Sequence, residues 1–198
     1  MNISDERIGY CNWSNSSNIY KDYHDTEWGI PEFNDKKLFE MLILEGFQAG
    51  LSWVTILNKR NNFRLAFDNF NPKTISKYNN KKISQLINNK GIIRNRLKIL
   101  STINSAKIVE RKFKKNRSFS DFFWEHINFQ PLDNSRKKLG EIPSQTDISI
   151  IISKKLKNLG FKFCGPIIIY SFMQAAGMVN DHLTSCPHYL KCKKINIK

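Results

Sequence analysis

Two histidines and two cysteines near the ends of the chain have the residue types and spacing of a metal site. Cys11 and His24 are separated by twelve residues near the N-terminus, and His182 and Cys186 form an H-x3-C pair near the C-terminus. Side chains four residues apart share one face of a helix. Two cysteines and two histidines are a typical tetrahedral ligand set for structural zinc, and such a site would join the two ends of the chain.

The other cysteine-containing segments leave this metal prediction open. His188 and Cys192 repeat the H-x3-C spacing. A disulfide framework is not expected for four cysteines in a chain of 198 residues whose N-terminus lacks the features of a secretion signal. On spacing alone, a zinc site and buried structural cysteines are therefore equal alternatives.

Glu45 is an acidic residue at a position where the sequence predicts burial. It lies in LFEMLILEGFQAGLSW, and the helical positions one turn away are Met41, Leu42 and Ala49. A carboxylate on such an apolar stripe needs a partner or a function, because burying an unpaired charge is costly. The alternatives are an ordinary glutamate, either paired with a basic residue or at the end of the stripe, and a carboxyl group that serves a binding site.

Aromatic side chains are concentrated near the N-terminus. Trp13, Tyr20, Tyr23 and Trp28 lie within sixteen residues, and Trp53 follows the segment that contains Glu45. Flat rings can stack on a nucleobase or contact a cation, although each ring alone is equally explained by filling a core.

The stretch GFKFCG, residues 160–165, joins two predicted helices through two glycines and mostly bulky residues. Pro166 follows directly and suits the first position of a helix, whose N-terminal N–H groups can bind a phosphate with added charge from Lys162. The alternative is a plain turn in which Gly160 only ends the first helix.

The charge balance favours an anionic partner. The chain has 32 basic and 17 acidic residues, a net charge of +15. Nucleic acid is the preferred partner class, although a general enrichment in Asn, Lys and Ile could also raise the lysine count. Apolar runs such as ISIII and PIIIYSF are too short to span a bilayer, so we expect a soluble, cytoplasmic protein without a membrane partner.

Apolar residues recur with helical periodicity along almost the whole sequence, so the elements that position these residues are predicted to be helices. This predicts an all-α fold. The longest helix is basic, and its expected apolar stripe is Ile93, Leu97, Leu100 and Ile103. Residues 128–147 form the one long irregular connection, and the C-terminal KCKKINIK is expected to be frayed. Helices are predicted over Asp35–Gly46, Ser52–Phe67, Pro72–Tyr78, Lys81–Asn89, Ile92–Lys114, Asp121–Ile127, Asp147–Leu159 and Pro166–Ala176.

Three blocks of sequence resemble a known family. YHDTEWGIPEFNDKKLFEMLILEGFQAGLSW, GIIRNRLKI and GFKFCGPIIIYSFMQAAGMVNDH are similar to 3-methyladenine DNA glycosylase I, a family of bacterial alkylation-repair enzymes. The resemblance extends from about Cys11 to Cys186. It implies one domain over residues 1–198 with the fold of the helix-hairpin-helix glycosylase superfamily, in which two helical lobes hold the damaged base between them.

The resemblance also implies how the chain holds DNA and metal. The hairpin of the superfamily binds the DNA backbone through main-chain N–H groups and matches Gly160, Phe161, Lys162, Phe163 and Gly165. The zinc ligands of the family match Cys11, His24, His182 and Cys186, rather than His188 and Cys192, which implies one structural Zn²⁺ per chain. Double-stranded DNA is the implied partner, and a monomer is expected.

The implied activity is that of a monofunctional enzyme that flips out cationic 3-methyladenine and hydrolyses its glycosidic bond, leaving an abasic site for base excision repair. Glu45 matches the base-recognition and catalytic carboxylate. Asn180 occupies the place of the catalytic aspartate of related families, Asp181 is expected to support His182, and Pro166 with Ile167 replaces a Schiff-base lysine. The aromatic walls match Trp13, Tyr20, Tyr23, Trp28 and Trp53. The alternatives are another alkylated base as substrate, or a catalytically silent protein that binds damaged DNA.

Overall fold

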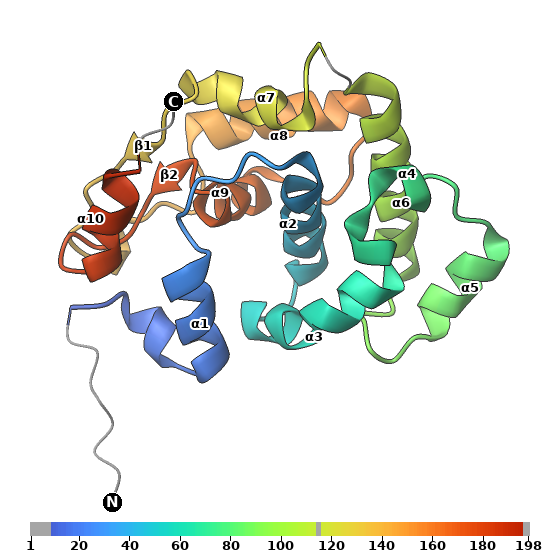
Figure 1. Cartoon of the computed structure of the whole chain (residues 1–198), viewed down its shortest axis with the longest axis horizontal. Helices are drawn as coiled ribbons and strands as arrows, with labels where there is room; N and C mark the ends of the chain where they lie inside the picture. Colours follow the sequence, from blue (N-terminus) through green and yellow to red (C-terminus); the bar gives the residue numbers. More distant parts are fainter. Residues whose placement is uncertain (1–8, 114–115, 196–198) are drawn as a thin grey trace, which may run out of the picture.

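The computed structural model describes residues 9–113 and 116–195. Within these ranges the chain is mainly α-helical and contains one pair of very short strands, so the all-α prediction is correct for the main architecture (Figure 1). The α-helices are α1 (Asn18–Thr26), α2 (Asp35–Gln48), α3 (Trp53–Ala66), α4 (Pro72–Ile75), α5 (Asn80–Asn88), α6 (Arg96–Lys112), α7 (Phe119–Trp124), α8 (Asp147–Leu159), α9 (Pro166–Ala175) and α10 (Pro187–Lys193). The 3-10 helices are η1 (Asn12–Asn15), η2 (Asp68–Phe70), η3 (Glu125–Ile127) and η4 (Leu139–Glu141), and the strands are β1 (Leu132–Asp133) and β2 (Val179–Asn180).

Helix α2 lies at the centre of the fold. Every residue from Leu38 to Phe47 is buried, and the helix packs against α3, α6, α7 and α9 (Figure 1). The side chain of Asn34 caps its first turn, and Lys98 Nζ donates hydrogen bonds of 2.9 and 2.8 Å to the carbonyl oxygens of Phe47 and Ala49 at its end. Because α2 is enclosed on all sides, any polar side chain that it carries in this run must lie in the interior.

Helix α6 differs from its prediction in both its start and its buried face. The side chain of Asn95 accepts a hydrogen bond of 3.1 Å from Lys98 N, which starts the helix at Arg96 rather than at Ile92. The core-facing residues include Ile99 and Ile103, whereas Leu97 is 68% exposed. The expected stripe through Leu97 was therefore wrong, and Lys114, its predicted last residue, lies outside the described ranges.

Two further helices differ from prediction. Helix α1 was not predicted, and it begins where Ser17 caps the N–H of Tyr20. The helix expected over Asp121–Ile127 instead starts at Phe119, because Ser118 and Asp121 form a reciprocal capping box, and it continues into η3. Side-chain caps, rather than apolar periodicity, decide both starting points.

The irregular segment and the C-terminal tail are tied together. Strand β1, within residues 128–147, pairs in parallel with β2, with Leu132 opposite Val179. The tail is not frayed as far as Lys193, because α10 includes this residue and its ammonium lies 2.7 Å from a carboxylate oxygen of Asp133. Residues 196–198, the end of the expected frayed tail, lie outside the described ranges.

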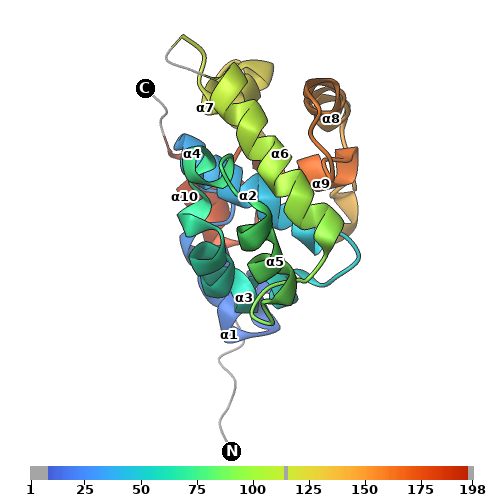
Figure 2. The same ribbon diagram turned by 90° about the vertical axis from the view of Figure 1, so that its right-hand side faces the viewer.

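One large apolar cluster extends over α2, α6, α7, α8 and α9, and a smaller aromatic cluster lies between α1 and α3. Figure 2 shows α6 crossing in front of α2, with α8 and α9 together on one side, and these last two helices are in contact. Among the described residues, none of the helices combines the length and the apolar character that a membrane span requires.

Candidate functional site

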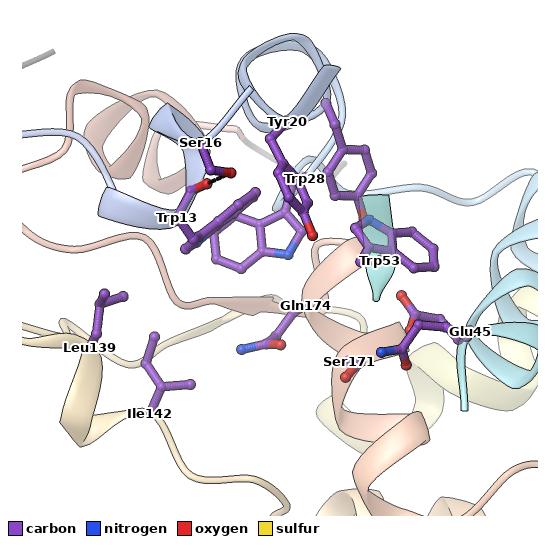
Figure 3. Close-up of a pocket in the computed structure, with 12 residues that line it drawn as sticks. Trp13, Ser16, Tyr20, Trp28, Glu45, Trp53, Leu139, Ile142, Ser171 and Gln174 are labelled. Atoms are coloured by element: carbon purple, nitrogen blue, oxygen red, sulfur yellow. Dashed lines mark hydrogen bonds between the residues drawn. The ribbon is translucent and has the colours of Figure 1, made fainter. Parts of the chain in front are cut away.

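A cavity of about 640 Å³ opens between the N-terminal segment, α2, α3 and α9. Figure 3 shows side chains reaching it from several directions: aromatic rings from around α1, Glu45 from α2, and Ser171 and Gln174 from α9. The residues that line it are Trp13, Ser16, Tyr20, Tyr23, Trp28, Glu45, Gln48, Trp53, Leu139, Ile142, Ser171 and Gln174.

All five aromatic residues predicted from the sequence line this cavity. The ring centroid of Trp13 lies 5.1 Å from that of Trp28 and 5.6 Å from that of Tyr20, and the Tyr23 and Trp53 centroids are 5.7 Å apart. The Tyr20 hydroxyl accepts a hydrogen bond of 3.1 Å from Val54 N at the start of α3. The rings therefore form a continuous wall, made mostly by α1 and the segments that flank it.

Glu45 is 4% exposed and lies against this wall. Within the described residues it makes no hydrogen bond or ion pair. Glu40, on the same helix, shows the ordinary alternative, because Arg60 and Arg64 approach its carboxylate to 2.7 and 2.8 Å. One alternative from the sequence was that Glu45 pairs with a basic residue. No such ion pair is present in the part of the chain that the structure describes.

Burial alone raises the pKa of Glu45 to about 8. The hydroxyl of Tyr23 is affected in the same direction, because burial, with a smaller contribution from the charge of Glu45, raises its pKa well above the usual value. The carboxyl group of Glu45 is thus mostly neutral at pH 7 when the cavity contains no cation. A positively charged ligand in the cavity would favour the ionised form and would attract it strongly in these low-dielectric surroundings.

The polar residues of α9 and the outer rim of the cavity were not found from the sequence. Ser171 and Gln174 lie three positions apart on one face of α9, and two polar residues in the apolar run PIIIYSFMQAA are a signal that could have identified them. Leu139 and Ile142 come from the long irregular segment, where the sequence has no periodicity that could place them.

Asn180, and not Asp181 as expected, contacts His182. Asn180 Oδ1 accepts a hydrogen bond of 3.3 Å from the backbone N–H of His182. Asp181 instead accepts hydrogen bonds from Asn134, Arg136, Tyr170 and Gln174. The expectation that Asp181 supports His182 was therefore wrong, because four other donors surround its carboxylate.

The four predicted metal ligands come together in one buried cluster. Cys11, His24, His182 and Cys186 are each at most 2% exposed, and their ligand atoms lie within 4.8 Å of one another. Cys186 Sγ is 3.6 Å from His24 Nε2 and 3.8 Å from His182 Nδ1, and Cys11 Sγ is 3.8 Å from the same His182 nitrogen. These separations match the edges of a tetrahedron whose centre is about 2.0–2.3 Å from each ligand atom. The cluster could hold one metal ion.

Hydrogen bonds around the cluster orient both imidazole rings. His24 Nδ1 lies 2.7 Å from the carboxylate of Asp25, and His182 Nε2 lies 3.1 Å from the carbonyl oxygen of Trp28. Both acceptors require a protonated ring nitrogen, which leaves the other nitrogen of each ring free to bind a metal. His188 lies outside the four, with its Nε2 at 3.3 Å from Asp25.

The turn GFKFCG is anchored by its two phenylalanines. Phe161 is 3% exposed, and a side-chain carbon on Gly46 of α2 would come within 3.1 Å of the Phe163 carbonyl oxygen. Gly160 has a φ of +100° and ends α8, which explains it without a ligand. Gly165 has a φ of −63°, and a side-chain carbon there would meet no atom within 4 Å. The local structure of the described chain therefore explains the glycine at position 160 but not the glycine at position 165. Lys162, between them, is exposed.

The buried carboxyl of Glu45 predicts a pH-dependent cost to stability. Its pKa is higher in the folded chain, about 8, than the ordinary 4.5, so the free energy of unfolding falls as the pH rises between these values. Glu45→Gln removes the ionisable group, and at pH 9 it should therefore be more stable than the wild type by on the order of 4 kcal/mol. Urea unfolding at pH 5 and pH 9 measures this.

Glu110→Gln, an exposed glutamate on α6, is the matched control and should change the free energy of unfolding little at either pH. A Glu45→Gln variant whose advantage over the wild type is the same at both pH values would contradict the assignment of Glu45 as a buried, unpaired acid.

Comparison with known proteins identifies relatives that cover nearly the whole chain. A family model described as methyladenine glycosylase matches residues 13–189. A curated relative from Escherichia coli K12, named DNA-3-methyladenine glycosylase 1, is 45% identical over 179 residues, which are 90% of this chain and 96% of the relative. The relative from Haemophilus influenzae, named DNA-3-methyladenine glycosylase, is also 45% identical, over 89% of this chain and 96% of its own length.

Solved structures agree with these relatives. A crystal structure of 3-methyladenine DNA glycosylase I has 45% sequence identity and a TM-score of 0.85, and covers 90% of this chain and 98% of its own. A structure from Staphylococcus aureus, described as the structural basis of 3-methyladenine recognition, has 34% identity and a TM-score of 0.87, with 94% and 97% coverage. On this evidence, the chain belongs to the methyladenine glycosylase family.

Proposed function

We propose that this protein is a DNA-3-methyladenine glycosylase that excises the cationic base by hydrolysis and leaves an abasic site for base excision repair. The observation that carries the proposal is Glu45, a buried carboxyl without a protein partner among the described residues, which faces a cavity walled by aromatic rings. Membership of the methyladenine glycosylase family and relatives with this named activity support the same conclusion.

The cavity suits a flat cation better than a neutral base. Methylation at N3 leaves the adenine ring of the nucleotide positively charged, and the electron-rich faces of Trp13, Tyr20, Tyr23, Trp28 and Trp53 attract such a ring. The Glu45 carboxyl can ionise opposite the cation and accept a hydrogen bond from the edge of the base. Unmodified adenine carries no charge, so it would not favour the ionised form of Glu45 and would gain no charge attraction from it.

Bond cleavage then requires little acid catalysis. The target nucleotide leaves the base stack, which costs least for a weakened, damaged pair. When the C1′–N9 bond breaks, its electron pair neutralises the purine, and water adds to the sugar carbon and loses a proton. Glu45 acts in this step by holding the base, and Pro166 and Ile167 stand where an enzyme that forms a Schiff base would need a lysine. We infer a monofunctional hydrolase without strand cleavage.

We further propose that α8, the GFKFCG turn and α9 form the DNA-gripping hairpin of a two-lobed glycosylase domain covering residues 1–198. Phe161 and Phe163 fix the turn, and the absence of a side chain at Gly165 leaves the backbone open to solvent. The free N–H groups in the first turn of α9, with the exposed Lys162, suit a phosphate of double-stranded DNA. Phosphate contacts of this kind grip DNA without reading its sequence.

We propose that the buried cysteine and histidine cluster binds one structural Zn²⁺. A donor set of two thiolates and two neutral imidazoles suits Zn²⁺ among the common metal ions. Four protein ligands leave no open position for a reacting water, so the ion would act as a cross-link between the two ends of the chain.

The proposed activity predicts release of free 3-methyladenine from methylated double-stranded DNA. Glu45→Ala should lower the rate of release by about a hundredfold or more, because it removes the group that balances the charge of the base, while binding to undamaged DNA should stay close to that of the wild type. Chromatography of the released bases and a gel-shift titration measure the two effects.

The same chromatogram separates the alternatives. Release of a different alkylated base by the wild type would show a shifted substrate, and DNA binding without any release would show a silent binding protein. Glu110→Gln is the control and should retain the wild-type rate, since it lies on the exposed face of α6.

If the turn holds a phosphate, Lys162→Ala should weaken DNA binding for every sequence. The slope of the logarithm of the binding constant against the logarithm of the salt concentration should become shallower by about one unit. Lys191→Ala, which removes the same charge from α10 at the far end of the molecule (Figure 1), should leave the slope unchanged. An unaltered slope in Lys162→Ala would place this lysine away from the DNA.

The metal proposal predicts about one equivalent of zinc per chain by elemental analysis. Cys186→Ser should lose most of the metal because it removes a ligand. Cys192→Ser should keep it, because Cys192, although buried, is not among the four clustered residues. Equal metal content in both variants, or none in the wild type, would argue for buried structural cysteines instead.

A further inference from the structure

We propose that Gln174 determines the specificity of the base site: its side-chain oxygen accepts a hydrogen bond from the exocyclic amine of the bound purine, and Asp181 fixes the amide in the orientation that this requires. The inference rests on the proposed function, since it names a contact to the base that the site would bind. Gln174 would thus be a second acceptor in the cavity, beside Glu45.

The orientation of the Gln174 amide follows from its partner. Gln174 lines the cavity, and its Nε2 lies 2.8 Å from Asp181 Oδ2. A carboxylate oxygen can only accept a hydrogen bond, so the nitrogen of the amide must be the atom that faces Asp181. In Figure 3 the amide nitrogen of Gln174 lies on the side of Leu139 and Ile142, and the amide oxygen lies on the side of Ser171 and Glu45. The cavity therefore receives the oxygen as an acceptor.

Asp181 is itself held rigidly. It is 1% exposed, and it accepts hydrogen bonds from the hydroxyl of Tyr170 at 2.6 Å, from Asn134 Nδ2 at 2.7 Å and from Arg136 Nε at 3.3 Å. These donors come from α9 and from the segment that contains β1. If the Gln174 amide turned over, its oxygen would face the Asp181 carboxylate, and two acceptors would be in contact without a proton between them. The buried carboxylate thus keeps the amide in one orientation.

The other side-chain amide at the cavity has no such support. Gln48 donates its Nε2 hydrogen to the carbonyl oxygen of Leu51, in the exposed turn that follows α2. Its orientation depends on a single backbone group at the surface. Gln174 is oriented by a fully enclosed carboxylate, and a preorganised acceptor discriminates better between ligands than a mobile one.

The hydrogen-bonding groups of the base fit this arrangement. In the 3-methyladenine cation that is still joined to the sugar through N9, the N–H donors are the two on the exocyclic amine at C6, so Glu45 and Gln174 can each accept one. A purine with an oxygen at C6 would instead place an acceptor against the side-chain oxygen of Gln174, which cannot donate a hydrogen bond. A site built to accept hydrogen bonds from an amine rejects the analogue that lacks them, because its buried acceptors would then stay unpaired.

Equilibrium binding of two free bases tests the proposal. The probes are 3-methyladenine and 3-methylhypoxanthine, which carry an amine and an oxygen respectively at C6, and quenching of the fluorescence of the cavity tryptophans gives their dissociation constants. The wild type should bind 3-methyladenine more tightly by about tenfold or more. Gln174→Met, which has similar size but no acceptor of this kind, should reduce that preference by about tenfold.

Two further variants separate recognition from simple support of the fold. Tyr170→Phe removes another hydrogen bond to the same Asp181 oxygen without changing Gln174, and it should keep the preference. Asp181→Asn lets the amide of Gln174 turn over, so it should lose part of the preference.

A preference that survives in Gln174→Met, or that falls equally in Tyr170→Phe, would overturn the assignment of Gln174. If Gln174→Met reduces the preference but Asp181→Asn leaves it at the wild-type value, the positioning role of Asp181 is overturned. Binding is measured without catalysis, so a wild-type protein that shows the preference but releases no base from DNA would contradict the proposed function and not this contact.

Discussion

The burial of one unpaired carboxyl group is the constraint on which the rest of the site depends. Helix α2 is enclosed by its neighbours over a run of ten residues, so Glu45 has no route to bulk water along its own helix. The aromatic wall lies on the remaining side, and burial raises the pKa of Glu45 to about 8. Such a group costs stability, and proteins generally tolerate that cost where the strained group has a function. Glu40 lies on the same helix, and its carboxylate is paired with the guanidinium groups of Arg60 and Arg64. The chain can therefore neutralise an acid on this helix when no ligand is involved.

The buried cysteine and histidine cluster and the aromatic wall are in direct contact. Trp13 follows Cys11 by two residues, and its ring centroid lies 5.3 Å from that of His24. Trp28 packs at 4.6 Å from the ring of His182 and supplies the carbonyl oxygen that orients it. The residues that join the two ends of the chain therefore also position two of the rings that face the cavity. A change that loosens the cluster would reach the base site through these contacts.

The chemistry of the site could be anticipated from the sequence better than its geometry. Glu45 was identified because apolar residues occupy the neighbouring positions of its helix, a local signal that burial then confirms. The four clustered cysteines and histidines were ambiguous by spacing, since the choice between His182 and His188 depends on contacts across more than 150 residues. Leu97 was misplaced because α6 packs through the face that carries Ile99 and Ile103, a choice made by tertiary contacts that local periodicity does not show. The surroundings of Asp181 could not be anticipated, because Asn134 reaches it from an irregular segment.

Helix α9 carries Gly165 at its N-cap and Gln174 near its end. An α-helix rises about 1.5 Å per residue, so these two positions are about 14 Å apart along one rigid axis. Whatever group is gripped at the start of α9 is therefore held at a set distance from whatever occupies the cavity. The helix fixes the distance between these two positions. A nucleotide held at both at once would have to place its base about that far from the gripped group.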